Sequence, residues 1–175
     1  LLKKGNIDFM GLRAEGYIKK TVGKVWDDKI IRVKTENKTP KGYNFIGFNF
    51  KHPVLKDREV RKALSMLFNR PLMQDKFEYN LSDQATGPIY TQSDYANPKT
   101  KPVTYDPQGA LKILNAAGWK DSDKDGILEK MINGKKTKLS FTILEPTEVM
   151  MKYLTVFKED ASKAGVEVNI KNVEW

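Results

Sequence analysis

Residues 57–70 narrow the choice of fold because they join a helix cap to a single apolar face. Asp57 can accept hydrogen bonds from the free amides of a first helical turn. Apolar side chains then recur with the three- and four-residue spacing of one helix face; they are Val60, Ala63, Leu64, Leu67 and Phe68. We therefore expect an amphipathic helix buried along that face, with Arg58, Arg61 and Lys62 on a solvated basic face.

Three more segments predict helices. Residues 71–77 start with a proline and favour a short helix. Residues 107–118 also start with a proline, follow the capping residue Asp106, and end at a glycine that can take the left-handed conformation. Residues 149–164 carry a long amphipathic pattern that Gly165 stops.

Short runs of β-branched or aromatic residues predict strands. Residues 29–34 are rich in isoleucine and valine, and residues 43–50 contain three phenylalanines. Residues 166–170 alternate apolar and polar side chains, which is the pattern of a half-buried strand. Because such strands alternate with helices along the chain, we predict an α/β fold with a mixed β-sheet flanked by helices.

A β-hairpin is expected near the middle of the second half of the chain. Asn133 and Gly134 stand between two strand-like runs, residues 127–132 and 138–144. Asn-Gly is the strongest short hairpin signal, because both residues tolerate the positive φ angles of a type I′ turn. We therefore predict that these two runs pair with each other.

Length and composition exclude several classes of protein. The chain has 175 residues, which is enough for one domain with its own core. It contains no cysteine, so disulfides and thiolate metal sites are excluded. No apolar run approaches the roughly 20 residues of a membrane-spanning helix.

The net charge of +9 raises the question of a nucleic-acid partner. Nucleic-acid-binding domains gather Lys and Arg on one face, where they release counterions from phosphates. In this sequence lysines occur in every segment and acidic residues are interleaved with them. We therefore predict a solvated basic surface and no nucleic-acid partner, with a small basic nucleic-acid-binding domain as the alternative.

Several motifs together resemble one known family. Residues 57–70 read DREVRKALSMLFNR, residues 105–110 read YDPQGA, and residues 117–119 read AGW. Residues 5–8 read GNID and residues 164–168 read AGVEV. In this order and spacing, these motifs resemble the solute-binding proteins of oligopeptide and dipeptide ABC importers, which form family 5 of the solute-binding proteins.

The resemblance implies a fold and a function. Family members have a two-lobed, type II periplasmic-binding-protein-like fold and are several times longer, so residues 1–175 are expected to be a single α/β lobe of a larger chain. Residues 1–5 then resemble the tail of a helix that begins upstream. The implied function is to capture extracellular peptides and deliver them to membrane permease subunits, without catalysis. The implied location is extracytoplasmic, with a lipid anchor on the full-length protein. Members that bind nickel chelates or sugars are the alternatives.

Two places are candidates for ligand binding. In α/β sheets, ligands bind outside the carboxyl ends of strands. One such place is Asn49, near the end of the predicted 43–50 strand; a strand-end hydrogen bond that fixes the hinge is the favoured alternative. The other is Glu145, Pro146 and Thr147, ahead of the long helix, and the matching loop of the family faces the ligand cleft. Thr147 is equally consistent with an ordinary helix start.

The segment 121–126 resembles the start of a calcium-binding loop. Asp121, Asp123 and Asp125 alternate and a glycine follows at the sixth position. The twelfth position should be a glutamate but is Ile132, and the only glutamate of the loop is Glu129 at the ninth. A turn stabilised by its aspartates is therefore favoured over a calcium site, and no cofactor is expected.

Catalytic residues are not recognisable. His52 is the only histidine, which excludes a two-histidine metal site and disfavours a His-based triad. The sequence also lacks a Gly-x-Ser-x-Gly nucleophile motif. The carboxylate pairs at 27–28 and 159–160 are expected to be surface charge. A hydrolase remains the alternative, and it predicts a convergent cluster of acid, base or metal-binding residues in the largest pocket. A position of His52 away from any carboxylate cluster would weaken this alternative further.

Overall fold

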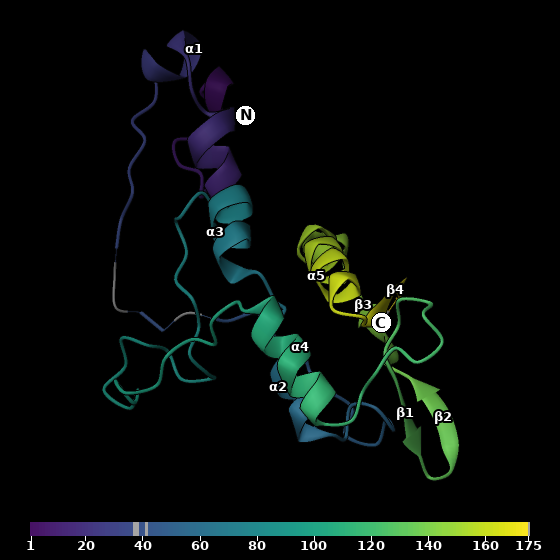
Figure 1. The fold of residues 1–175 in the computed structure, drawn as a ribbon. Helices are drawn as coiled ribbons and strands as arrows, with labels where there is room; N and C mark the ends of the chain where they lie inside the picture. The colour runs from purple at the N-terminus through teal and green to yellow at the C-terminus, as the bar shows by residue number, and fades with distance from the viewer. Residues whose placement is uncertain (37–38, 41, 175) are drawn as a thin grey trace. The chain divides into compact units, whose positions relative to one another are not determined.

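The computed structural model describes residues 1–36, 39–40 and 42–174. The chain divides into two compact units. Unit 1 consists of Leu1–Tyr43 and Pro71–Pro102, and unit 2 of Asn44–Arg70 and Val103–Trp175. Every described strand lies in unit 2 (Figure 1). The residues predicted to bind ligand also belong to unit 2. That residues 1–175 form a single lobe stays a prediction.

Unit 1 is built from short helical pieces and irregular chain. It contains a 3₁₀ turn at Leu2–Lys4, a π-helical turn at Gly16–Lys20 and helix α1 at Lys24–Asp27. Most of helix α3 (Arg70–Glu78) also belongs to it, which confirms the predicted short helix. The π-helical turn and α1 were not predicted, because neither carries a side-chain cap or buried residues.

The strands predicted at residues 29–34 and 43–50 are wrong. Both segments are irregular throughout their described residues. The side chains of Ile31 and Phe45 are 90% and 73% exposed. β-Branched and aromatic residues favour a strand only where a neighbouring strand takes up the backbone hydrogen bonds and a face is buried. In the described part of the chain, no strand pairs with either segment.

Helices α2 (Arg58–Met66) and α4 (Pro107–Ala116) lie in unit 2 and pack against each other (Figure 1). The amide of Glu59 donates to the Asp57 carboxylate over 2.9 Å, as expected for a helix cap. The buried residues of α2 and its end are those of the predicted face: Val60, Ala63, Leu64 and Leu67. Asp106 caps α4 in the same way, accepting from the Gly109 amide over 2.8 Å. Both predicted helices are confirmed.

The hairpin forms around the predicted turn but with a different partner strand. Strand β1 (Glu129–Ile132) pairs antiparallel with β2 (Lys135–Lys138), and Asn133 and Gly134 have φ angles of 51° and 77°. Because the turn contains only two residues, the partner of Ile132 must be Lys135. The predicted pairing with residues 138–144 is therefore wrong, and most of that run belongs to a second pair of strands.

Strand β3 (Ser140–Glu145) pairs in parallel with β4 (Glu167–Asn172). The connection between them is a 3₁₀ turn at Glu148–Met150 followed by helix α5 (Met151–Lys163). Most of the buried side chains of this β3–α5–β4 unit are apolar and include Phe141, Leu154, Phe157, Val166 and Val168. The carboxylates of Glu145 and Asp160 are buried with them. The predicted α/β class is confirmed, and parallel and antiparallel pairing both occur, in two separate pairs. Of the helices that the structure describes, none combines the length and apolar composition needed to span a bilayer.

The end of α5 packs closely against the chain that leads into the hairpin. Gly165 has a φ angle of +75°, and the amide of Val166 donates to the Ala161 carbonyl over 3.0 Å. The Gly165 carbonyl accepts from the Leu128 amide over 2.8 Å. A Cβ atom at position 165 would lie 2.7 Å from Cγ of Leu128. Glycine is thus required here by both the backbone angle and the space.

Candidate functional site

The loop at residues 145–147 lies at the carboxyl end of the parallel strand pair. Glu145, the last residue of β3, is in register with Asn172, the last residue of β4. Both strands therefore end at the same edge, and the helical segment that starts at Glu148 begins beside it. Ligands of α/β proteins bind at this kind of edge.

The buried residue Glu145 accepts hydrogen bonds from the rest of this loop. Its side chain is buried, and its Oε1 atom accepts from the amide and the hydroxyl of Thr147 over 2.9 and 2.7 Å. The Glu145 carbonyl accepts from the Val173 amide over 3.0 Å. Thr147 is exposed and stands before the first helical turn, but its hydroxyl binds Glu145 instead of capping that turn. Pro146 is half-buried between them. Hydrogen bonds to Glu145 thus hold the loop from both sides, while Thr147 is exposed.

Asn49 lies in a turn and not at the end of a strand. Its side-chain oxygen accepts from the Lys51 amide and its carbonyl from the His52 amide, each over 3.0 Å. The Nδ1 atom of His52 accepts from the Val54 amide over 3.4 Å, so this side chain also serves the turn. In the described part of the chain, Asn49 has hydrogen bonds within this turn and none with the 145–147 loop.

Arg61 was expected on a solvated basic face, and this is wrong. Its Nη1 atom donates to the carbonyls of Leu55 and Lys56, each over 2.8 Å. Its guanidinium lies 4.4 Å from the ring centroid of Phe50. Arg61 therefore fastens the turn after Asn49 to helix α2. The sequence signal was an arginine one turn after a helix start, which is too common to indicate this role.

Asp160 was expected to be surface charge, but it is only 6% exposed. Its carboxylate accepts from Asn69 Nδ2 over 3.2 Å and from Lys163 Nζ over 2.9 Å, and the Tyr105 hydroxyl also binds it. Burial raises the pKa of Asp160, but these hydrogen bonds outweigh it and the pKa is lowered. Its position three residues after the buried Phe157 was the available signal.

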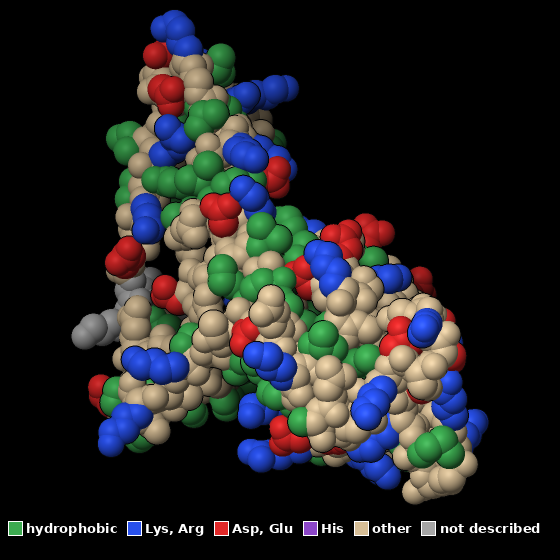
Figure 2. Space-filling view, in the orientation of Figure 1, with side chains coloured by type: hydrophobic (Ala, Val, Ile, Leu, Met, Phe, Trp, Pro, Cys, Tyr) green, Lys and Arg blue, Asp and Glu red, His purple; other side chains and the backbone are tan. Residues whose placement is uncertain are grey.

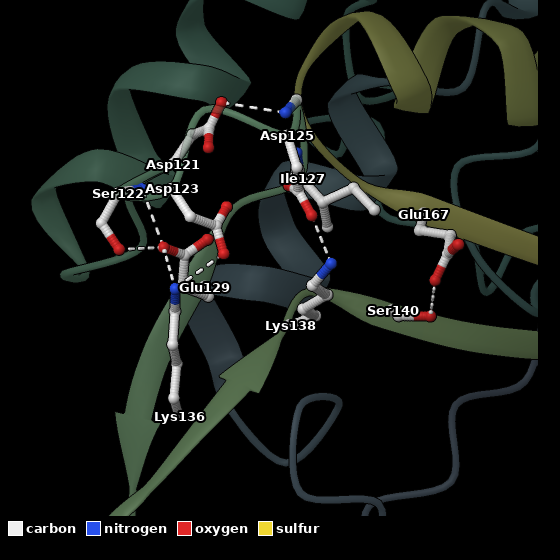
Figure 3. Close-up of polar contacts among 11 residues, drawn as sticks. Asp121, Ser122, Asp123, Asp125, Ile127, Glu129, Lys136, Lys138, Ser140 and Glu167 are labelled. Atoms are coloured by element: carbon white, nitrogen blue, oxygen red, sulfur yellow. Dashed lines mark hydrogen bonds and ion pairs between the residues drawn. The ribbon is translucent and has the colours of Figure 1, made fainter.

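The acidic turn brings together the three predicted aspartates and Glu129 (Figure 3). One carboxylate oxygen of each residue lies within 4.8 Å of those of the others. The amide of Gly126 donates to Asp121 over 3.0 Å, and the amide of Ile127 donates to Asp125 over 2.9 Å. These are the hydrogen bonds of an aspartate-stabilised turn, which was the favoured prediction. His52 is not a member of this carboxylate group.

An open hollow of about 320 Å³ lies at the opposite edge of the parallel pair. It is lined by Asp125, Gly126 and Ile127 of the acidic turn, by Lys158 and Ser162 of α5, and by residues 166–169. Since Glu167 is the first residue of β4, this hollow is at the amino ends of the strands and apart from the 145–147 loop. It is therefore not the predicted ligand site.

Charges are mixed on the visible face of the protein. Lys and Arg side chains alternate with Asp and Glu, without a continuous basic area on that face (Figure 2). Several lysines of the described chain form ion pairs, such as Lys24 with Asp28 at 2.9 Å and Lys136 with Asp123 at 2.8 Å. This arrangement favours the solvated basic surface over a nucleic-acid interface.

Comparisons with known proteins identify a family and several relatives of this chain. The whole chain, residues 1–175, matches the family described as "Bacterial extracellular solute-binding proteins, family 5 Middle". The chain is 31% identical over 177 residues to the oligopeptide-binding protein AppA of Bacillus subtilis (strain 168), covering 99% of this chain and 31% of AppA. It is 27% identical over 111 residues to the nickel-binding periplasmic protein of Escherichia coli (strain K12), covering 63% of this chain and 21% of that protein.

Solved structures share the fold. An oligopeptide-binding protein from Thermus thermophilus, complexed with a pentapeptide, matches with a TM-score of 0.64 and 27% identity over 70% of this chain and 20% of that one. AppA from Bacillus subtilis, in complex with a nonapeptide, matches with a TM-score of 0.63 and 33% identity over 74% of this chain and 26% of that one. The chain thus spans about a third or less of these proteins, and the type II periplasmic-binding-protein-like class is confirmed.

Proposed function

The chain belongs to family 5 of the bacterial extracellular solute-binding proteins, and from this membership we propose that it forms one lobe of the peptide-binding component of an ABC importer. The second lobe then lies elsewhere in the same parent chain. Two lobes close around a peptide, and the closed protein docks on permease subunits in the membrane. We place the full-length protein outside the cytoplasm with a lipid anchor, and we assign it binding without catalysis.

The observation that carries the proposal is the loop at residues 145–147. It lies at the carboxyl ends of two parallel strands, and a buried carboxylate holds its backbone in one conformation. A rigid loop loses little conformational entropy when it binds a ligand, and main-chain groups can bind the backbone of any peptide. We propose that Pro146 and exposed Thr147 contact the ligand and that Glu145 positions them.

Asn49 has a different place in the proposal. Its side chain accepts a hydrogen bond within a turn, and Arg61 of α2 donates to the two carbonyls that follow that turn. The segment before α2 is therefore attached to the helix by hydrogen bonds. We propose that this turn lies at the rim of the cleft and fixes the direction of the chain entering the hinge. A direct contact between Asn49 and ligand is the alternative.

The first test identifies the ligand of the full-length protein. The protein is purified natively and denatured, and the released small molecules are identified by mass spectrometry. We expect a ladder of short peptides. A nickel chelate or a sugar as the released molecule would contradict the peptide proposal while leaving the family intact.

The second test addresses the 145–147 loop. Glu145→Gln replaces a charged hydrogen-bond acceptor by a neutral one of the same shape, and neutral hydrogen bonds are about half as strong. We expect the affinity for the identified peptide to fall roughly fivefold, which corresponds to about 1 kcal/mol. The matched control is Glu148→Gln, an exposed residue at the start of the helical segment after the loop, which should change affinity less than about twofold. Equal effects of the two variants would contradict the assigned role of Glu145.

A further inference from the structure

We propose that the acidic turn at residues 121–129 is a Ca²⁺ site, independent of the peptide-binding loop. Four carboxylates converge there, from Asp121, Asp123, Asp125 and Glu129, and one oxygen of each lies within 4.8 Å of the others. The aspartates alternate along the turn, and a glycine with a φ angle of +87° at position 126 lets the chain double back. The turn joins the end of α4 to strand β1.

Glu129 provides a second observation, independent of the spacing of the aspartates. Its side chain is only 3% exposed, so each of its two carboxylate oxygens needs a partner. Its Oε1 atom accepts from the amide and hydroxyl of Ser122, the amide over 2.7 Å, and pairs with Lys136. Its Oε2 atom is buried without a hydrogen-bond partner in the described part of the chain. Figure 3 shows Glu129 facing Asp123 across the turn.

A bound cation would give the Glu129 Oε2 atom a partner and would neutralise the charge of the carboxylates. A buried carboxylate oxygen without a partner carries its full desolvation penalty, and a bound cation removes it. Lys136 lies 2.8 Å from Asp123 and 3.1 Å from Glu129, and Lys138 pairs with Asp125. These two lysines neutralise only half the charge of the four carboxylates. The turn therefore keeps an excess of negative charge where its oxygens converge.

Oxygen-only ligands on an exposed turn suit Ca²⁺ better than Mg²⁺. Ca²⁺ accepts six to eight oxygens in flexible geometry, whereas Mg²⁺ demands a tight octahedron and gives up its waters reluctantly. In related loops the seventh position supplies a main-chain carbonyl, here that of Ile127, and the twelfth supplies a glutamate. Ile132 occupies the twelfth position, so buried Glu129 at the ninth is the last carboxylate of this site. With fewer carboxylates and two competing lysines, the affinity should match that of weak extracellular calcium modules.

The test measures Ca²⁺ binding to the full-length protein after treatment with a chelator. Isothermal titration with CaCl₂ should give one site with a Kd of about 10⁻⁴–10⁻³ M, the range of extracellular modules. Titration with MgCl₂ should give at least tenfold weaker binding. A lack of saturable binding up to about 10 mM CaCl₂, or equal binding of Mg²⁺, would overturn the proposal.

Variants locate the site on the turn. Asp123→Asn should weaken Ca²⁺ binding at least tenfold, whereas Asp94→Asn, a matched change on an exposed loop of unit 1, should alter it less than twofold. Lys136→Gln removes a competing cation and should tighten binding about threefold, an effect that damage to the fold would not produce. Unchanged Kd values for Ca²⁺ in both Asp123→Asn and Lys136→Gln would refute the site. Peptide affinity is measured in parallel, so failure here is distinguishable from failure of the transport proposal.

Discussion

Phe157 connects helix α5 to the rest of the unit 2 core, and replacing it should have a large effect. Its side chain is 2% exposed, and its ring centroid lies 5.4 Å from that of Phe68 at a tilt of 44°. Phe68 lies just after Leu67, the C-cap of α2, so this aromatic pair joins two elements that are distant in sequence. Phe157→Ala removes one ring of the pair and leaves a cavity beneath α5.

The magnitude follows from burial and from the ring contact. A fully buried Phe→Ala change costs about 3–5 kcal/mol, which includes the lost transfer free energy and the cavity. A tilted aromatic pair contributes about 0.5–1.5 kcal/mol beyond its buried area. Phe68 is half-buried, so Phe68→Ala should cost about 2 kcal/mol. The double variant should cost about 1 kcal/mol less than the sum of the two single variants.

Hydrogen exchange of the α5 amides in the full-length protein measures the free energy of unfolding locally, whatever the stability of other domains. Val149→Ala is the control, because that side chain is 51% exposed at the start of the same helical segment and should change stability by less than about 0.5 kcal/mol. A loss below about 1 kcal/mol for Phe157→Ala would refute the assignment of Phe157 to the core. An additive double variant would refute the ring contact.

Three further predictions concern single residues of unit 2. Because the pKa of Asp160 is lowered on folding, its carboxylate contributes stability above about pH 4 that is lost as the pH falls through the folded-state pKa. Urea unfolding should accordingly show a steeper acid loss for the unsubstituted protein than for Asp160→Asn, and parallel pH profiles would contradict this. Gly165→Ala should cost about 2–4 kcal/mol in the same assay, through its positive φ angle and the clash with Leu128; a neutral effect would show that the α5 end is differently packed. Asp57→Ala should cost about 1 kcal/mol by freeing the Glu59 amide, and Asp57→Ser should recover most of it; no recovery would argue against the capping role.

Features that depend on near neighbours in the sequence were predicted well. The caps of α2 and α4 each involve a carboxylate and an amide two or three residues later. The hairpin turn depends on two adjacent residues that tolerate positive φ angles, Asn133 and Gly134. The 145–147 loop was placed correctly at a strand end, because a strand followed by a helix fixes that order.

Features that depend on distant segments were not predictable. Residues 29–34 and 43–50 have the composition of strands, but a strand also needs a partner, and the residues themselves do not specify one. The run 138–144 was assigned to the hairpin, whereas most of it pairs with β4. Its apolar side chains fit either pairing, and only the two-residue turn and the parallel partner decide between them.

The same division applies to the candidate sites. The sequence alone placed the carboxylates of residues 121–129 in a turn and Glu145 at the end of a strand, because both placements depend only on local patterns of residues. The tertiary structure decided which carboxylates are buried, and therefore that Glu145 holds its own loop and that Glu129 keeps an oxygen without a partner. Asp160 meets Asn69 across 91 positions of sequence. Burial depends on what packs against a residue, and a local pattern of side chains does not contain that information.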